Sequence, residues 1–185
     1  MRVDRERLRA DVEANARFGR EETDDGRGRT VLTGTEADRE ARELLVERLE
    51  DAGLDLRVDA VGNVLGEWVP RSADPDAPPV AAGSHLDSVP TGGIFDGPLG
   101  TYGALEAVRA LQESDVEPVR PLAVVSWTEE EGARFPPGLL GSAVATGKRS
   151  LADARSTRDG DGVTLAAALD DIGFAGEGVV DPSTW

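Results

Sequence analysis

Apolar residues recur along the chain at helical and strand spacings that alternate with each other. Residues 4–18 place Leu8, Val12 and Ala16 four positions apart, which predicts an amphipathic helix. The next segment, residues 21–28, is charged and contains glycine, which indicates a loop. The N-terminal part of the chain is therefore expected to be a helix followed by a loop.

A second helix is predicted between residues 35 and 53. Thr35 can cap its start, with Asp38 three residues later, and Gly53 favours its end. Its apolar stripe consists of Ala41, Leu44, Leu45 and Leu49. Residues 54–60 then alternate apolar and polar positions, as a half-buried strand does. Residues 62–63 indicate a turn into another short strand.

The remaining pattern continues the alternation of strands and helices. Residues 71–79 are rich in proline and predict a surface connection. The apolar run 80–83 predicts a strand covered on both faces, and residues 121–127 predict a second buried strand. Helices are predicted over residues 98–111 and 164–172, the latter ended by glycine. This order predicts an α/β fold in one domain spanning residues 1–185.

Composition limits the chemistry that the chain can carry. A chain of 185 residues is long enough to bury a core, and it has no apolar run near the ~20 residues that cross a bilayer. Its charged N-terminus lacks a secretory pattern, so a cytoplasmic location is expected. The absence of cysteine excludes disulfides and thiolate metal sites. Any metal must therefore be bound by the single histidine and by carboxylates.

The charge of the chain is strongly acidic. Thirty-six acidic and 20 basic residues give a net charge of -16, which would repel nucleic acid and anionic membrane surfaces. Neither is expected as a partner. The preferred explanation is adaptation to high salt, where a solvated carboxylate surface keeps a protein soluble. An ordinary acidic protein is the alternative.

Polar residues follow the two predicted buried strands. The first strand continues into residues 83–87 and the second into residues 128–132, and the glycine-containing loop 90–97 lies between them. In open α/β sheets, sites form beyond the carboxyl ends of the strands. The three segments are therefore expected to bring one imidazole and several carboxylates to the same edge.

The expected cluster needs a cation. Each pair of carboxylates about 4 Å apart would repel by ~4 kcal/mol at an effective dielectric near 20. One or two divalent ions can compensate, with His85 as the nitrogen ligand and Asp87 holding its other ring nitrogen. Asp96 is able to bridge two ions, and one of the adjacent glutamates is free to accept a proton from a water. The carboxylates considered are Asp87, Asp96, Glu130 and Glu131.

Each of these features also has a purely structural interpretation. A histidine in a loop is commonly a surface residue, three consecutive glutamates are typical of a solvated helix start, and two consecutive glycines form turns. All three features, however, follow predicted strand ends or lie between them. Their conjunction favours the metal-site interpretation.

Two motifs resemble a known enzyme family. Residues 83–100, GSHLDSVPTGGIFDGPLG, and residues 127–135, WTEEEGARF, closely resemble the N-carbamoyl-L-amino-acid hydrolases, allantoate amidohydrolases and β-ureidopropionases. These are amidases of the hydantoinase-carbamoylase type within the aminoacylase and carboxypeptidase-like di-zinc metallohydrolase superfamily. Residues 59–66 and 137–142 are also similar to that family. Glu129 stands where the family commonly has Asn or Asp, which leaves the Glu-Glu-Gly register intact.

The resemblance implies a fold and a set of roles. It implies the N-terminal part of a three-layer, zinc-exopeptidase-like α/β domain with a mixed sheet, without the lid and dimerisation domain. His85 would bind one zinc or manganese ion, Asp96 would bridge two such ions and Glu131 would bind the second. Glu130 would be the general base, and Asp87 would support His85. The reaction would be metal-dependent hydrolysis of a C–N bond in an N-carbamoyl, ureido or related amide substrate.

The resemblance also implies missing parts. Family members are longer and carry further histidine ligands, whereas this chain has only His85. Each ion would then have two protein ligands, which predicts weak affinity. The later strands of the catalytic sheet would be missing as well, which predicts an open sheet edge. The expected partners are a small amide or ureido substrate and, to complete the site, a second copy or a complementing C-terminal chain. An inactive fragment acting as an interaction or weak metal-binding module, and an aminoacylase or dipeptidase with the same metal core, are the alternatives.

Overall fold

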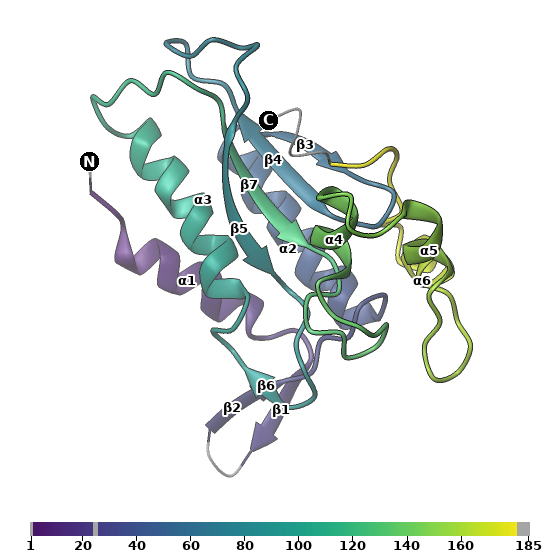
Figure 1. The fold of residues 1–185 in the computed structure, drawn as a ribbon. Helices are drawn as coiled ribbons and strands as arrows, with labels where there is room; N and C mark the ends of the chain where they lie inside the picture. Colours follow the sequence, from purple (N-terminus) through teal and green to yellow (C-terminus); the bar gives the residue numbers. More distant parts are fainter. Residues whose placement is uncertain (1, 24–25, 181–185) are drawn as a thin grey trace.

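The computed structural model describes residues 2–23 and 26–180, in which helices are interspersed with single strands and runs of strands (Figure 1). The helices are α1 (Arg5–Asn15), α2 (Glu36–Asp51), α3 (Pro98–Gln112), α4 (Leu140–Ala145), α5 (Leu151–Ser156) and α6 (Leu165–Asp171). The strands are β1 (Arg20–Thr23), β2 (Gly26–Arg29), β3 (Asp55–Val58), β4 (Val64–Trp68), β5 (Val80–His85), β6 (Gly92–Gly93) and β7 (Leu122–Trp127). None of these helices has the length and apolar character that crossing a membrane requires.

The central sheet has four strands in the order β3-β4-β7-β5. Strand β4 pairs antiparallel with β3 and β7, whereas β5 pairs parallel with β7. The predicted α/β fold with a mixed sheet is therefore confirmed. Strand β7 is buried at Ala123, Val124 and Val125, as its apolar sequence predicts.

Strand β5 lies at the edge of this sheet. Val80, at its start, is 50% exposed, and Ala82 and Gly83 are exposed as well. The prediction that residues 80–83 are covered on both faces is wrong. An apolar run alone does not distinguish a central strand from an edge strand, because the pattern does not record how many neighbours the strand has.

Helices α1, α2 and α3 cover one face of the sheet (Figure 1). Leu45 and Leu49 of α2 and Leu105 of α3 are fully buried there, and each such side chain contributes about 1.5–3 kcal/mol by leaving water. Helix α2 begins as predicted, with the Thr35 hydroxyl oxygen accepting a hydrogen bond from the Asp38 backbone N–H. Helices α1 and α3 also confirm their predicted segments.

Helices α4, α5 and α6 form a second layer of packing beside the sheet. Their core includes Phe135, Leu140, Leu165 and Leu169, all fully buried. Helix α6 confirms the helix predicted over residues 164–172. Helices α4 and α5 were not predicted, because six-residue helices leave too few positions for a periodic pattern.

Within the segment predicted as a loop over residues 21–28, the described residues 21–23 and 26–28 belong instead to two paired strands; residues 24–25 lie outside the described part of the chain. Strands β1 and β2 pair antiparallel, and β2 pairs in turn with β6, where Arg29 lies opposite Gly92. The loop prediction failed because these strands carry almost no apolar residues, so backbone pairing alone defines them. Gly92 and Gly93, placed in the loop 90–97 with a turn as the alternative interpretation, form the short strand β6.

Candidate metal centre

The ends of β5 and β7 place polar side chains at one edge of the sheet. His85 is the last residue of β5 and lies in register with Trp127, the last residue of β7. Thr128 to Glu131 follow directly. Because the two strands are parallel neighbours, their carboxyl ends open on the same side, as the sequence predicts.

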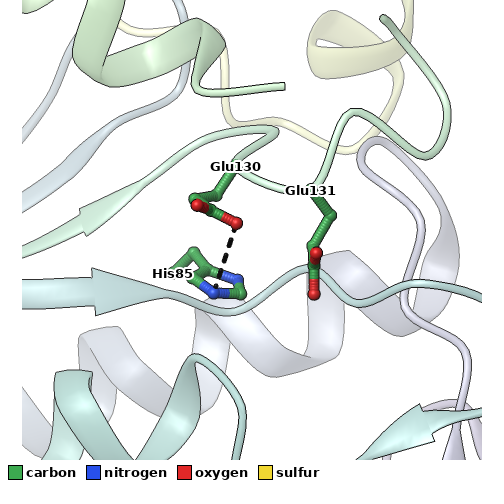
Figure 2. A group of neighbouring side chains, drawn as sticks. All are labelled: His85, Glu130 and Glu131. Carbon is green, nitrogen blue, oxygen red and sulfur yellow. Dashed lines mark ion pairs between the residues drawn. The ribbon is translucent and has the colours of Figure 1, made fainter. Parts of the chain in front are cut away.

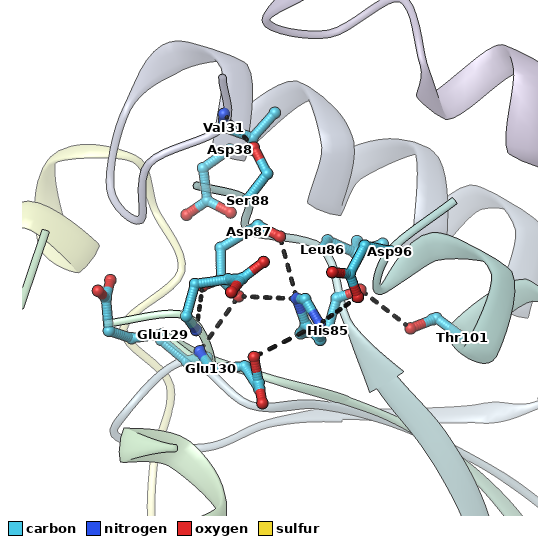
Figure 3. Close-up of polar contacts among 12 residues, drawn as sticks. Val31, Asp38, His85, Leu86, Asp87, Ser88, Asp96, Thr101, Glu129 and Glu130 are labelled. Carbon is cyan, nitrogen blue, oxygen red and sulfur yellow. Dashed lines mark hydrogen bonds and ion pairs between the residues drawn. The ribbon is translucent and has the colours of Figure 1, made fainter. Parts of the chain in front are cut away.

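The His85 ring has defined contacts on both nitrogens (Figure 3). It is buried, and its Nδ1 lies 3.0 Å from the backbone oxygen of Asp87. A carbonyl oxygen only accepts, so Nδ1 carries the proton in this contact. Nε2 faces two carboxylates, 3.7 Å from Oδ1 of Asp96 and 3.6 Å from Oε2 of Glu130. The nitrogen on the side of the acidic residues is therefore the one with a lone pair to offer.

Three of the expected side chains form a compact group. His85, Glu130 and Glu131 each offer a ligand atom, and these atoms all lie within 4.8 Å of one another (Figure 2). Asp96 is outside this group, although its carboxylate approaches Nε2 of His85. Its side chain is 75% exposed, whereas that of Glu130 is 33% exposed. The Glu130 carboxylate therefore lies as close to Nε2 of His85 as the Asp96 carboxylate does.

Asp87 connects the two strand ends. Its carboxylate is buried, lies 3.6 Å from Nδ1 of His85, and accepts hydrogen bonds from the backbone N–H groups of Glu130 (3.3 Å) and Glu131 (3.1 Å). One side chain therefore sets the position of the imidazole and of the backbone that carries both glutamates.

The acidic surroundings shift the ionisation of the site. Burial opposes charging of His85, but Asp87 and then Glu130 outweigh it and raise the pKa of the ring to about 9. Burial raises the pKa of Glu131, and the nearby charges of Asp96 and Glu130 add to this against the opposing effect of His85. In the absence of a cation, the carboxylates thus favour a protonated imidazole.

The donor set fits a divalent cation. Separations of 3.6 and 3.7 Å from Nε2 to the carboxylate oxygens are too long for hydrogen bonds. They are close to the ~3.4 Å between two ligand atoms of a tetrahedral ion with bonds of about 2.0–2.2 Å. One neutral imidazole nitrogen and several carboxylate oxygens are also suitable ligands for such an ion.

Two glycines allow the site to assemble. Gly97 has φ +80°, and a Cβ atom there would lie 2.6 Å from the backbone oxygen of His85 and 2.8 Å from its ring. A Cβ on Gly83 would lie 1.8 Å from the backbone oxygen of Val125 on β7. Larger residues at either position would displace the strand end that carries His85.

Glu129 departs from the interpretation of the three glutamates as a solvated helix start. Residues 129–131 are not helical, and Glu129 is buried with φ +53°. Its Oε1 accepts hydrogen bonds from the backbone N–H groups of Arg134 and Phe135, both at 2.9 Å. Burial raises the pKa of this carboxyl. That interpretation is therefore wrong here, because Glu129 orders the loop from the inside.

A buried amide holds the same loop from the other side. The Asn63 side chain accepts a hydrogen bond from the Thr128 backbone N–H (3.0 Å) and donates to Asp59 (2.9 Å) and to the backbone oxygen of Gly141 (3.2 Å). The sequence indicated only a turn at residues 62–63. A single sequence does not predict that the Asn63 side chain holds this loop, because Thr128 and Gly141, to which it bonds, are distant along the chain.

Comparisons with known proteins agree with this arrangement. Residues 63–180 match the model of peptidase family M28. The N-carbamoyl-L-amino-acid amidohydrolase of Rhizobium meliloti is 42% identical over 150 residues, which cover 81% of this chain and 36% of that protein. The allantoate amidohydrolase of Bacillus subtilis is 39% identical over 152 residues, covering 82% and 36%.

Solved structures of amidases are similar to this chain as well. The crystal structure of a hydantoinase/carbamoylase family amidase from Burkholderia ambifaria superposes with a TM-score of 0.89 at 44% identity. The match covers 97% of this chain and 43% of that chain. This chain therefore spans about a third of the length of the curated relatives that it matches.

Proposed function

Because the chain belongs to peptidase family M28, we propose that it carries part of the active site of a metal-dependent amidohydrolase. The proposed substrates are amino-acid-like molecules with an N-carbamoyl or ureido group, since relatives named for such reactions match most of the chain. The observation that carries the proposal is the group formed by His85, Glu130 and Glu131 where β5 and β7 end. Residues 1–185 would then be the N-terminal portion of the catalytic domain.

Five side chains have proposed roles. His85 would hold one divalent ion through Nε2, Asp96 would be the ligand shared between two ions, and Glu131 would hold the second. Asp87 keeps the His85 ring oriented. This role is supported by the contacts of its carboxylate with the His85 ring and with the backbone N–H of Glu131. Glu130 is the general base. Zinc and manganese are the proposed metals, since the ligands offer nitrogen and carboxylate oxygen and no thiolate.

The chemistry then follows from these positions. Bound divalent ions supply Lewis acidity, which polarises the substrate carbonyl and lowers the pKa of the attacking water. The Glu130 carboxylate, partly open to solvent, accepts a proton from that water and returns it to the leaving nitrogen as the C–N bond breaks. Asp87 keeps the proton of His85 on Nδ1, so that Nε2 stays available as a ligand.

The proposed ligand set is incomplete for strong binding. Each ion would have two protein ligands from this chain, whereas a catalytic zinc usually has three. We propose that the others come from a polypeptide equivalent to the remaining length of the relatives, either continuous with these residues or as a separate complementing chain. A second copy of the chain is the other candidate partner.

A second function in the same class is favoured by the family model itself. The matching model is that of a peptidase family, so an aminoacylase or dipeptidase with the same metal core is a candidate. Hydrolysis of N-acyl amino acids or dipeptides at a higher kcat/KM than N-carbamoyl amino acids, by the completed protein, would favour this alternative.

The test combines metal stoichiometry with turnover in the completed protein. His85→Ala and Asp96→Ala are each expected to abolish cooperative zinc or manganese uptake. Glu130→Gln is expected to retain the metals and lose turnover, by about 10²–10⁴-fold for a general base. Glu47→Gln, an exposed substitution on α2, serves as the matched control for a glutamate remote from the site.

Two results would contradict the proposal. Unchanged metal stoichiometry in both the His85 and the Asp96 variants would show that the metal ligands are assigned wrongly. A completed protein that takes up metal but hydrolyses none of the amide substrates would instead support a weak metal-binding or interaction module.

A further inference from the structure

Arg29 is a buried cation behind the proposed metal centre. It is fully buried on β2, and none of the ion pairs formed by residues 2–23 and 26–180 includes it. Its Nη1 donates to Oδ1 of Asn15 at 2.6 Å, and its Nε has no hydrogen-bond partner. Burying a guanidinium without a carboxylate partner is costly, so its position requires a compensating contribution.

The guanidinium reaches the backbone that follows His85. Nη2 donates a hydrogen bond to the carbonyl oxygen of Leu86 and lies 3.5 Å from the carbonyl oxygen of Asp87. The same Asp87 oxygen accepts the Nδ1 proton of His85 at 3.0 Å. Arg29 and His85 therefore share the Asp87 carbonyl oxygen as an acceptor, and this carbonyl group lies between the guanidinium and the imidazole.

The two backbone segments are also joined without the guanidinium. The Ser88 backbone N–H donates to the oxygen of Val31 at 2.9 Å, and the Val31 N–H donates to Oγ of Ser88 at 2.9 Å (Figure 3). That hydroxyl in turn donates to the backbone oxygen of Arg29 at 3.2 Å. These contacts keep β2 beside residues 86–88 when the side chain at position 29 changes.

We propose that Arg29 is a positioning residue that fixes the carbonyl groups of Leu86 and Asp87 and so holds the His85 ring in its Nδ1–H form. The effect of this positioning on metal binding rests on the proposed function, since only the Nδ1–H form presents an unprotonated Nε2 to a metal. Asn15 completes the arrangement by anchoring the guanidinium to α1.

Charge and geometry predict opposite effects on metal affinity. A positive charge behind the site repels a divalent ion, so its removal on electrostatic grounds alone would strengthen binding. Loss of positioning would weaken binding. Arg29→Lys separates the two effects, because the ammonium keeps the charge but has no planar fork to span Asn15 and both carbonyls.

The experiment uses the fact that His85 is the only histidine. Long-range ¹⁵N NMR of the metal-free chain at pH 10, where most rings are neutral, reports which nitrogen of His85 carries the proton. Zinc affinity is measured on the same samples by competition with a chelator. Arg29→Lys, Asn15→Ala and the control Arg109→Lys are compared with the parent, since Arg109 is a buried arginine paired with Asp11 away from the site.

Arg29→Lys is expected to mix the two His85 tautomers and to weaken zinc binding about 10- to 100-fold, as loss of outer-shell partners does. Asn15→Ala, which keeps the guanidinium but frees it from α1, is expected to produce the same changes to a smaller extent. Arg109→Lys is expected to lower the unfolding temperature without changing the tautomer or the zinc affinity.

A folded Arg29→Lys variant with the tautomer of the parent overturns the proposal, and so does one that binds zinc as tightly or more tightly. If that variant does not fold, an unchanged tautomer in Asn15→Ala overturns it instead. A parent chain that binds zinc without any change in the His85 signals refutes the proposed function. The metal-free tautomer then still tests the positioning role of Arg29 independently.

Discussion

The proposed metal-binding role of His85 conflicts with the environment of its ring when no metal is bound. Its Nε2 faces Asp96 and Glu130, which favour a protonated ring, whereas a metal requires the neutral ring. The acidic residues that attract a cation therefore also retain a proton at the same nitrogen. Proton release is therefore expected to accompany the proposed metal binding at neutral pH.

This competition predicts how metal affinity varies with pH. The His85 pKa is raised from 6.5 to about 9, so at pH 7 most metal-free molecules carry a proton on the ring. Apparent zinc affinity is expected to rise about tenfold per pH unit from pH 7 to 9 and to level off above 9. Chelator competition across this range measures the slope, and an affinity that is flat between pH 7 and 9 would contradict it.

The same shift affects the stability of the metal-free chain, with a definite sign. Because the folded pKa lies above the unfolded value, the protonated ring stabilises the fold fully below pH 6.5, and this contribution is lost as the pH rises through about 9. In the proposed zinc-bound chain the ring is neutral, so the stabilising effect of the ring proton is absent there. The NMR signals of the single histidine follow both effects.

At the residue scale, the sequence indicated the groups that carry charge more readily than those that position them. His85, Asp87, Glu130 and Glu131 follow strand ends that periodicity predicts, so their convergence was predictable. Glu129 and Asn63 act through buried hydrogen bonds to distant backbone groups. Such bonds have no local pattern, because the partner is defined only by the folded chain.

At the scale of elements, the loop that precedes α3 packs directly against the end of β5. Gly97 caps this helix without a side chain, and its backbone passes against the His85 ring. The Thr101 hydroxyl, one turn into α3, donates to the backbone oxygen of His85 at 3.3 Å. Helix α3 and the end of β5 are thus one unit around the imidazole.

Gly97→Ala is expected to disrupt this unit. The added methyl group meets His85 backbone and ring atoms, and alanine is strained at φ +80°, so the variant should lose about 1–3 kcal/mol of unfolding free energy. Zinc affinity should fall at least about tenfold, because His85 must move. Denaturant unfolding and zinc titration measure the two effects.

The matched control lies two turns further along the same helix. Gly103 has open space around its Cβ position and a helical backbone, so Gly103→Ala should stabilise the chain by about 0.5–1 kcal/mol. Zinc affinity should be unchanged. Equal stability and zinc affinity in the Gly97 and Gly103 variants would show that Gly97 is not constrained by His85.

Elements with an apolar stripe were predictable, and those defined by pairing were not. Helix α2 has both its stripe and its Thr35 cap, so its bounds were close to those observed. The hairpin of β1 and β2 lacks such a stripe, although it delivers Arg29 to the site. The hairpin is held in place by the backbone pairing of β2 with β6, and β6 is remote from it in the sequence.

At the scale of the whole molecule, the dominant property is the net charge of -16. We propose, as the composition suggests, that the surface is adapted to high salt. Exposed ion pairs such as those of Arg39 with Glu36 and Glu43 use only part of the acidic surface. The remaining carboxylates repel one another in the folded chain more strongly than in the extended one.

The unfolding temperature is therefore expected to rise with KCl between 0.1 and 2 M. Most of the gain should occur by about 1 M, where the Debye length has fallen to about 3 Å. A variant with the exposed acids Asp115 and Glu117 both changed to lysine should start more stable and gain less from salt. Calorimetry measures both, and a flat or falling response of the parent would exclude this adaptation.

The α/β class was predictable for the molecule as a whole, whereas the position of each strand in the sheet was not. Strand β7 and strand β5 carry similar apolar runs, but β7 is central and β5 lies at the edge. An apolar run indicates that a segment forms a strand, but it contains no information about the order of the strands in the sheet. That order depends on which segments compete for pairing.

The parallel register of β5 and β7 has an optical consequence. It places Trp127 opposite His85 on the adjacent strand, about 4.8 Å away along the hydrogen-bonding direction. A paramagnetic ion such as Co²⁺ bound at His85 is expected to quench the fluorescence of this indole strongly. Trp68 pairs with Leu122 at the opposite end of β7 and is expected to be quenched far less. Strand pairing thereby gives the chain an intrinsic emission signal that reports whether the imidazole holds an ion.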